Sequence, residues 1–292
     1  MSYKSLLRNG AFIIAASILT LAACKRSSTD NTTATPALTS ADDNGGYASD
    51  AAKLETTSND VISIADVAAA GDGSTLRTTA SSCATVTNDT ATGLLIINFG
   101  TTDCLCVDGK YRKGEIIVHY TGRYKDSGSV HTISYSSYFV NDNQVSGSKT
   151  VTNQGMNSSG QVWYTVDVND SMTLTSDSVI TWTAHRTRTW LTGYTTATRT
   201  DDSYSIADQT GDSTVLKRAN GHVFNFTITS PLTIAYGCDF IEAGTLQISS
   251  TTFTDGYDRI LNYSYGLGST PGECDDLAQL TIGTHTYVIT LH

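Results

Sequence analysis

Large and small side chains alternate along residues 179–190, VITWTAHRTRTW, and this is the clearest pattern in the chain. The even positions hold isoleucine, tryptophan, alanine and arginine, whereas the odd positions hold valine, threonine and histidine. Successive side chains of a strand point to opposite faces, and threonine and tryptophan both favour strands. The pattern therefore predicts a long strand inside a sheet. Because Arg186 and Arg188 share the even face with Trp182 and Trp190, we expect that face to leave the core partway along.

Similar runs fill the chain from Cys83 onward, where apolar residues alternate with polar ones between polar turns. Short strands joined by such turns build an antiparallel meander, which can stay extended or fold into a sandwich. A chain of 292 residues can also bury a sizeable core. We therefore expect an all-β domain over residues 80–292, as a meander or a sandwich. The other predicted strands are residues 84–87, 94–99, 115–124, 130–140, 144–152, 161–169, 171–175, 198–207, 215–217, 223–230, 232–236, 245–252, 258–265, 278–282 and 286–291.

Apolar residues follow a helical spacing ahead of this domain, from Val61 to Ala68. Gly71 would end such a helix, and Asn59 or Asp60 could cap a shorter one. The Thr-Thr-Ser run at residues 56–58 interrupts the pattern. The sequence thus predicts one short helical segment within residues 51–71.

The first 23 residues have the features of a secretory signal peptide. Lys4 and Arg8 precede an apolar run at residues 11–23, which is too short for a comfortable membrane span. The run ends in LAAC, which resembles the lipobox of bacterial lipoproteins and implies cleavage before Cys24 and a diacylglycerol on its sulfur. A free cysteine near a conventional cleavage site is the alternative. Residues 24–50 are mostly polar, so we predict a lipidated, disordered tether.

The charged residues of the chain indicate where the protein is located and which partners it has. Residue 25 is lysine rather than aspartate, so by analogy with bacterial sorting rules we expect an outer-membrane lipid anchor, on the periplasmic side or at the cell surface. The net charge is -10 and only 16% of residues are charged, which argues against nucleic acid as a partner because nothing in the chain is basic enough to neutralise a run of phosphates.

Several loop motifs resemble those of a group of uncharacterised Bacteroidota lipoproteins. They are FGTTDCLCVDGKYRKGEI, then Gly147, then TWTAHRTRTW followed by Leu-Thr-Gly, and then YGLGSTPGECDD. The resemblance covers about residues 60–292. It rests on cysteines, glycines and aromatics rather than on catalytic residues, so it implies an envelope location and an all-β fold but no activity.

Cysteine usage predicts disulfides, because an exported chain meets oxidising conditions. With one of the six cysteines lipidated, five remain and at least one must stay unpaired. We expect Cys238 to pair with Cys274, and Cys83 to pair with either Cys104 or Cys106. The last two are too close in sequence to bridge each other easily.

The sequence singles out no metal site, cofactor or catalytic centre. The CxC at residues 104–106 lacks the further ligands of a zinc site, and none of the GxSxG, HExxH or P-loop motifs occurs. An acidic cluster could form a calcium loop, but turn chemistry explains it more simply. Its members are Asp255, Asp258, Glu273, Asp275 and Asp276.

The candidate ligand face consists of Trp182, Arg186, Arg188 and Trp190. Aromatic faces bind sugar rings and arginine can hold an acidic sugar, but cross-strand packing of arginine stems over tryptophans is the favoured explanation. We therefore expect a non-enzymatic lipoprotein of the cell envelope with a structural or ligand-binding role. A carbohydrate-binding module of a glycan-uptake system and a fimbrial subunit are the alternatives. The expected partners are the membrane, through Cys24, and a glycan or envelope protein.

Overall fold

The computed structural model describes residues 44–69, 84–196, 198–265 and 274–291. The predicted signal peptide, Cys24 and most of the predicted tether lie outside the described residues, as does Cys83. The described chain contains one helix, α1 (Asn44–Ala69), followed by strands that form a 15-stranded sheet. No helix in this part of the chain is both long and apolar enough to cross a membrane.

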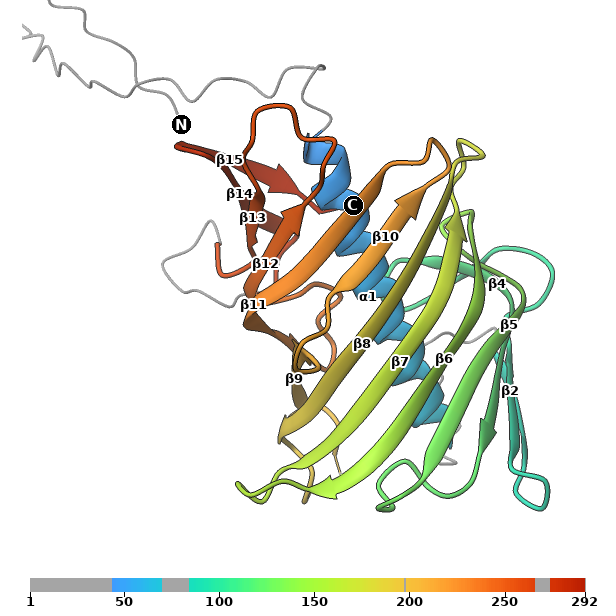
Figure 1. Ribbon diagram of the computed structural model, residues 1–292. Helices are drawn as coiled ribbons and strands as arrows, with labels where there is room; N and C mark the ends of the chain where they lie inside the picture. Colours follow the sequence, from blue (N-terminus) through green and yellow to red (C-terminus); the bar gives the residue numbers. More distant parts are fainter. Residues whose placement is uncertain (1–43, 70–83, 197, 266–273, 292) are drawn as a thin grey trace, which may run out of the picture. The chain divides into compact units, whose positions relative to one another are not determined.

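The sheet is antiparallel, and most strands pair with their neighbours in sequence (Figure 1). Its strands are β1 (Thr85–Asp89), β2 (Leu94–Asn98), β3 (Cys104–Leu105), β4 (Tyr111–Tyr120), β5 (Val130–Val140), β6 (Asn143–Met156), β7 (Val162–Thr173), β8 (Val179–Thr192), β9 (Ser203–Asp208), β10 (Thr214–Arg218), β11 (Val223–Ala235), β12 (Ala243–Ser249), β13 (Arg259–Asn262), β14 (Leu277–Ile282) and β15 (His285–Thr290). β9 and β10 share one position in the sheet, because each pairs with a different half of β8 and of β11. The predicted all-β fold is confirmed, and the described residues form the meander.

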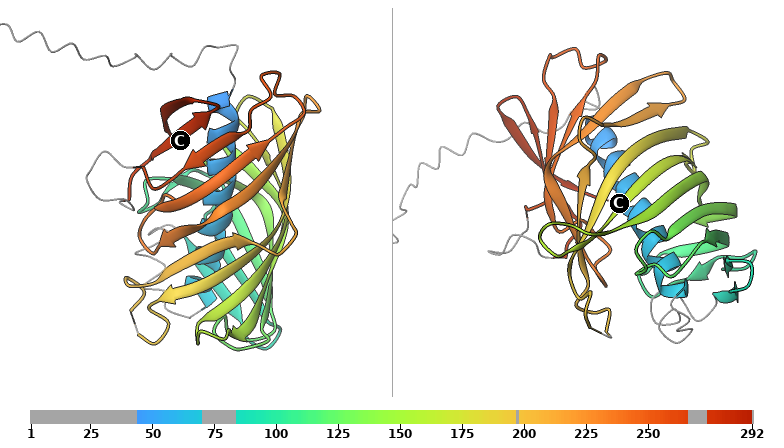
Figure 2. Two further views of the ribbon diagram at one scale, coloured as in Figure 1. Left: turned by 60° about the vertical axis from the view of Figure 1, so that its left-hand side comes forward. Right: turned by 60° about the horizontal axis from the view of Figure 1, so that its bottom comes forward.

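The sheet curves around α1, so that the helix lies along its concave side (Figures 1 and 2). Ala48, Ala51 and Val61 of the helix are fully buried. A helix with apolar residues on most of its faces is stable only when it is covered on most sides. One narrow stripe remains partly accessible, at the three- and four-residue spacing of a single helix face. The stripe consists of Ser49, Lys53, Thr56, Asp60 and Ser63.

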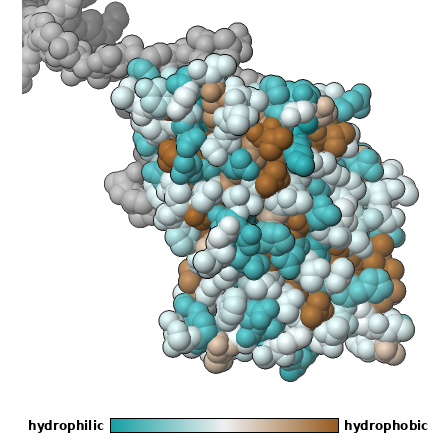
Figure 3. Space-filling view, viewed as in Figure 1, coloured by the Kyte–Doolittle hydropathy of each residue, from teal (hydrophilic) through white to brown (hydrophobic). Residues whose placement is uncertain are grey.

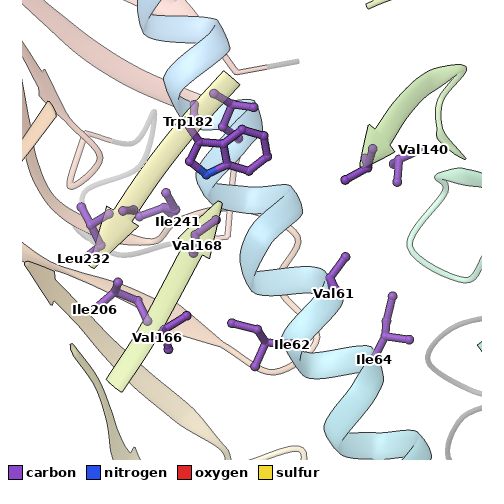
Figure 4. Close-up of a cluster of buried hydrophobic side chains, with 14 of the residues drawn as sticks. Val61, Ile62, Ile64, Val140, Val166, Val168, Trp182, Ile206, Leu232 and Ile241 are labelled. Carbon is purple, nitrogen blue, oxygen red and sulfur yellow. The ribbon is translucent and has the colours of Figure 1, made fainter. Parts of the chain in front are cut away.

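The core lies between the helix and the concave face of the sheet. Around the helix, Figure 4 shows side chains from Val61, Ile62, Ile64, Val140, Val166, Val168, Trp182, Ile206, Leu232 and Ile241. Along β8 the even positions from 180 to 190 are buried, whereas the odd positions are exposed or half-buried, which confirms the predicted alternation. Figure 3 shows a mostly neutral to hydrophilic surface on the side viewed in Figure 1, with small hydrophobic patches.

The helix is longer than predicted. It begins at Asn44 rather than at residue 51, so the last residues of the predicted tether are helical, and it ends at Ala69. Residues 56–58 do not interrupt it, although Thr and Ser are modest helix formers. Thr57 and Ser58 are buried against the sheet. Tertiary packing of this kind outweighs intrinsic propensity and explains the added length.

The strands also differ from the prediction in several places; for example, β6 extends to Met156 rather than residue 152, and β9 begins at Ser203 rather than residue 198. The two strands expected around residue 170 form the single strand β7, and the two expected around Pro231 form β11. Register shifts between Ile228 and Thr233 show that Pro231 lies in an irregular stretch, where its missing N–H removes no regular ladder bond. The two-residue strand β3 was not predicted, because it is too short to show an alternating pattern.

Candidate functional site: the groove beside helix α1

The candidate ligand face of β8 is buried against α1. Trp182, Arg186, Arg188 and Trp190 are each no more than 3% exposed. The expectation that this face leaves the core is therefore wrong, and so is its use as an accessible ligand face. The physical reason is that α1 supplies polar partners: Arg186 forms an ion pair with Glu55, and Arg188 donates to the Asn59 Oδ1 at 3.3 Å.

Aromatic packing completes this buried face. The Trp190 ring lies 5.0 Å from the ring of Tyr204, and the Arg188 guanidinium lies 3.8 Å above the same tyrosine ring. The favoured explanation is that arginines pack over aromatic rings, and Arg188 does so. The ring under Arg188 is that of Tyr204 on β9, however, not of a tryptophan on β8.

Ion pairs join the acidic residues of α1 to cations of the sheet and its loops. Removing several charged groups from water costs free energy unless each finds a partner, so these pairs fix how the helix lies in the sheet. Lys149 adds a further polar contact, with its Nζ 3.0 Å from Ser58 Oγ and 3.1 Å from Asp170 Oδ2. The pairs are Asp50–Arg218, Glu55–Arg186, Asp60 with Lys110 and Arg112, and Asp66–Arg199.

A groove follows the accessible stripe of the helix, and we call it the helix groove. Its larger chamber has a volume of about 450 Å³. A smaller chamber of about 210 Å³ lies further along the helix, beside Asp60 and Ser63. Asp108 and Asp239 line both chambers, so they mark the junction between them. The larger chamber is lined by Ala52, Lys53, Thr56, Thr57, Asp108, Gly109, Lys110, Val140, Asn141, Asn143, Met172, Asp239, Phe240 and Leu291.

Most charges of the helix groove neutralise one another. Asp108 accepts hydrogen bonds from both terminal nitrogens of Arg112, at 2.8 and 2.5 Å. Lys110 Nζ lies 2.5 Å from Asp60 Oδ2 and 3.8 Å from Asp108 Oδ2. Burial alone would raise the pKa of Asp108, but the contacts with Arg112 and Lys110 outweigh it and the pKa is lowered. Asp108 therefore stays ionised and paired.

Asp239 and Lys53 differ from these neighbours. Neither forms a hydrogen bond or an ion pair through its side chain with another residue in the described part of the chain. Burial raises the pKa of Asp239 to about 6, with the charges of Asp108 and Asp60 adding to this effect and Lys110 opposing it. The helix groove thus holds one carboxylate and one ammonium group without protein partners among the described residues.

A disulfide holds the loop that carries Asp239. Cys238 and Cys274 are bonded, with their Cα atoms 5.5 Å apart, which confirms the predicted pair. Cys104 is disulfide-bonded as well, whereas Cys106 is a free, buried thiol. The candidate role of Cys106 in a disulfide is therefore wrong. The pairing of Cys83 stays a prediction, because that residue lies outside the described part.

Metal ligands are not gathered anywhere in the described residues, where no group of three or more His, Cys, Asp or Glu side chains could hold an ion. Members of the acidic cluster serve other contacts. Asp255 accepts a hydrogen bond from Arg259 at 2.9 Å, and Asp258 accepts one from the side chain of Gln247 at 2.6 Å. Asp275 accepts a hydrogen bond from the backbone N–H of Leu277 at 2.9 Å. Glu273 lies outside the described residues.

Comparison with protein-family models, with curated proteins and with solved structures finds no match to this chain. The similarity to Bacteroidota lipoproteins therefore stays a prediction from the sequence.

Proposed function

We propose that the protein is a lipid-anchored component of the bacterial cell envelope that binds a small ligand in the helix groove and catalyses no reaction. The observation that carries the binding role is a pair of oppositely charged side chains, Asp239 and Lys53, that have no side-chain partners among the described residues and line a chamber of about 450 Å³. Small-molecule sites commonly have volumes of about 300–1,000 Å³ and contain a few convergent polar groups.

The anchoring part of the proposal rests on the sequence around Cys24. A lipid on that residue would be followed by a polar tether that leads into α1. Ion pairs and burial hold α1 inside the sheet. In this arrangement the membrane anchor is joined to the interior of the fold, and the helix groove stays on the accessible side of α1.

A carbohydrate-binding module is the second candidate. Phe240 and Asn141 both line the larger chamber, and an aromatic ring and an amide in one chamber suit a sugar. The buried tryptophans of β8 no longer support this candidate.

Fractionation tests the anchor. Wild-type protein should pellet with membranes, whereas Cys24→Ala should be released as soluble protein. A variant that stays in the pellet after a carbonate wash contradicts the lipid anchor at Cys24.

Thermal shift tests the binding role. The soluble Cys24→Ala protein is heated with a panel of amino acids, short peptides and glycans, because a ligand that binds the folded state raises the melting temperature. If no member of the panel raises it, a ligand-binding role is wrong and a structural role replaces it. If only glycans raise it, the second candidate replaces the first.

A further inference from the structure

We infer that the helix groove binds a small zwitterion, an amino acid or a short peptide, whose ammonium group pairs with Asp239 and whose carboxylate pairs with Lys53. The inference rests on the proposed binding role, because it names the ligand of the same groove. It depends on three features of the groove: which charges are already paired, which remain, and what lines the space between them.

The paired charges leave no excess of either sign. Asp60 and Asp108 are two carboxylates, and Lys110 and Arg112 are the two cations that contact them, at 2.5–3.8 Å. Arg112 is fully buried and is held by both carboxylates. These four groups form a closed set that a ligand would have to break in order to use them.

The two remaining charges have opposite signs and come from different walls. Lys53 belongs to α1, and Asp239 belongs to the loop that follows β11. A half-buried carboxylate is unfavourable without a partner, as the raised pKa of Asp239 shows. A ligand with a single charge would satisfy one of the two groups and would be repelled by the other. A zwitterion satisfies both.

Part of the larger chamber suits an apolar side chain. Val140, Met172, Phe240 and Leu291 contribute to its lining, alongside Lys53 and Asp239. A free amino acid with a large apolar side chain, or a dipeptide of such residues, combines this apolar body with an ammonium group and a carboxylate. Both of these groups are ionised at neutral pH.

Calorimetry on the soluble Cys24→Ala chain tests the inference. The probes are dipeptides with aliphatic or aromatic side chains, their N-acetyl derivatives, which lack the ammonium group, and their C-terminal amides, which lack the carboxylate. We expect at least one dipeptide to bind, and each blocked form to bind about tenfold or more weakly, because each loses a charge-assisted hydrogen bond.

Two variants assign the contacts. Asp239→Asn should weaken binding of the dipeptide about as much as N-acetylation does, and it should add little to the effect of N-acetylation. Lys53→Gln should weaken binding of the dipeptide about as much as C-terminal amidation does, and it should add little to the effect of amidation. The matched controls Asp212→Asn and Lys217→Gln change exposed charges outside the groove and should leave binding unchanged. If neither Asp239→Asn nor Lys53→Gln weakens binding of the dipeptide, the inference is overturned.

Acidification gives an independent readout. The charged groups around Asp239 are Asp60 on α1, Asp108 and Lys110 beside β4, and Arg112 on β4. Since the pKa of Asp239 is about 6, dipeptide affinity should fall as pH drops from 7 to 5. Affinity that is constant over this range contradicts the pairing with Asp239.

The two levels of the proposal fail in different ways. Binding of glycans without binding of any dipeptide overturns the zwitterion and leaves a ligand-binding protein. If no amino acid, peptide or glycan binds, both the zwitterion and the ligand-binding role are overturned.

Discussion

Arg186 on β8 and Glu55 on α1 form an ion pair across the interior, although 131 residues separate them in the sequence. Arg186 also contacts Asp208 at the end of β9, so a single buried cation is shared by one carboxylate of the helix and one of the sheet. Taking such groups out of water costs several kcal/mol per ion, and their mutual attraction offsets this only in good geometry. The arrangement therefore specifies where the helix lies.

Replacing Arg186 should be more harmful than replacing Glu55. Arg186→Met leaves two buried carboxylates without their cation and should lower the free energy of unfolding by about 3–5 kcal/mol. Glu55→Gln leaves Arg186 paired with Asp208 and should cost about 1–3 kcal/mol. Urea denaturation of the Cys24→Ala protein measures both. The control Arg123→Met removes an exposed pair with Asp126 and should have no measurable effect. Equal losses for the two core variants would show that Asp208 does not share the cation.

The disulfide between Cys238 and Cys274 should contribute strongly to stability. It closes a loop with a sequence separation of 36 residues, for which the loss of chain entropy in the unfolded state amounts to about 3–4 kcal/mol. Cys238→Ser and Cys274→Ser should therefore lower the melting temperature by similar amounts. The double variant should be no worse than either, because both single changes remove the same bond. Calorimetric scans that show additive losses would mean that the side chains act separately from the bond.

The strands and this disulfide could be predicted because both depend on local features. Along β8 the period-two pattern is uninterrupted, and the two cysteines flank the predicted strands at residues 245–252 and 258–265. The position of α1 could not be predicted in the same way. Arg186 and Arg188 indicate exposure when only their own strand is considered, because the helix residues that contact them, Glu55 and Asn59, are more than a hundred residues away.

The helix groove could not be predicted for a related reason. It is formed by α1, the turns beside β4 and β6, and the loop after β11. No sequence pattern links these segments. The only local signal was the disulfide at Cys238, next to Asp239, which marked that loop as fixed in position.

Cys106 should resist alkylation in the folded protein. The residue is 4% exposed, and burial raises the pKa of its thiol although Arg112 opposes the shift. Because the thiolate is the reacting species, iodoacetamide at neutral pH should leave Cys106 unmodified in the folded protein. It should modify Cys106 once the protein has been unfolded in the absence of a reductant. Mass spectrometry of peptides measures this. In Cys238→Ser the thiol of Cys274, an exposed residue, should be modified in the folded state and serves as the positive control. Rapid labelling of native Cys106 would show that the thiol reaches solvent.

Asp202 should make stability depend on pH. The residue is 3% exposed, and burial raises the pKa of its carboxyl group to about 6, with Asp66 adding to the shift and Arg199 and Lys125 opposing it. In the unfolded chain the pKa returns to about 3.9. Between these values the folded state binds a proton that the unfolded state does not, so this group lowers the free energy of unfolding as pH rises towards 6. The penalty is complete above pH 6 and absent below the unfolded pKa.

Asp202→Asn removes this penalty, because the amide has nearly the same shape and no charge to bury. The variant should be more stable than its parent at pH 7.5, and the difference should shrink steadily as pH falls from 6 to 4. Urea denaturation at several pH values measures the difference. Asp212→Asn, an exposed carboxylate in a turn, should show no such trend and serves as the matched control. A gain at pH 7.5 that persists unchanged at pH 4 would show that the carboxylate of Asp202 is not the source of the dependence.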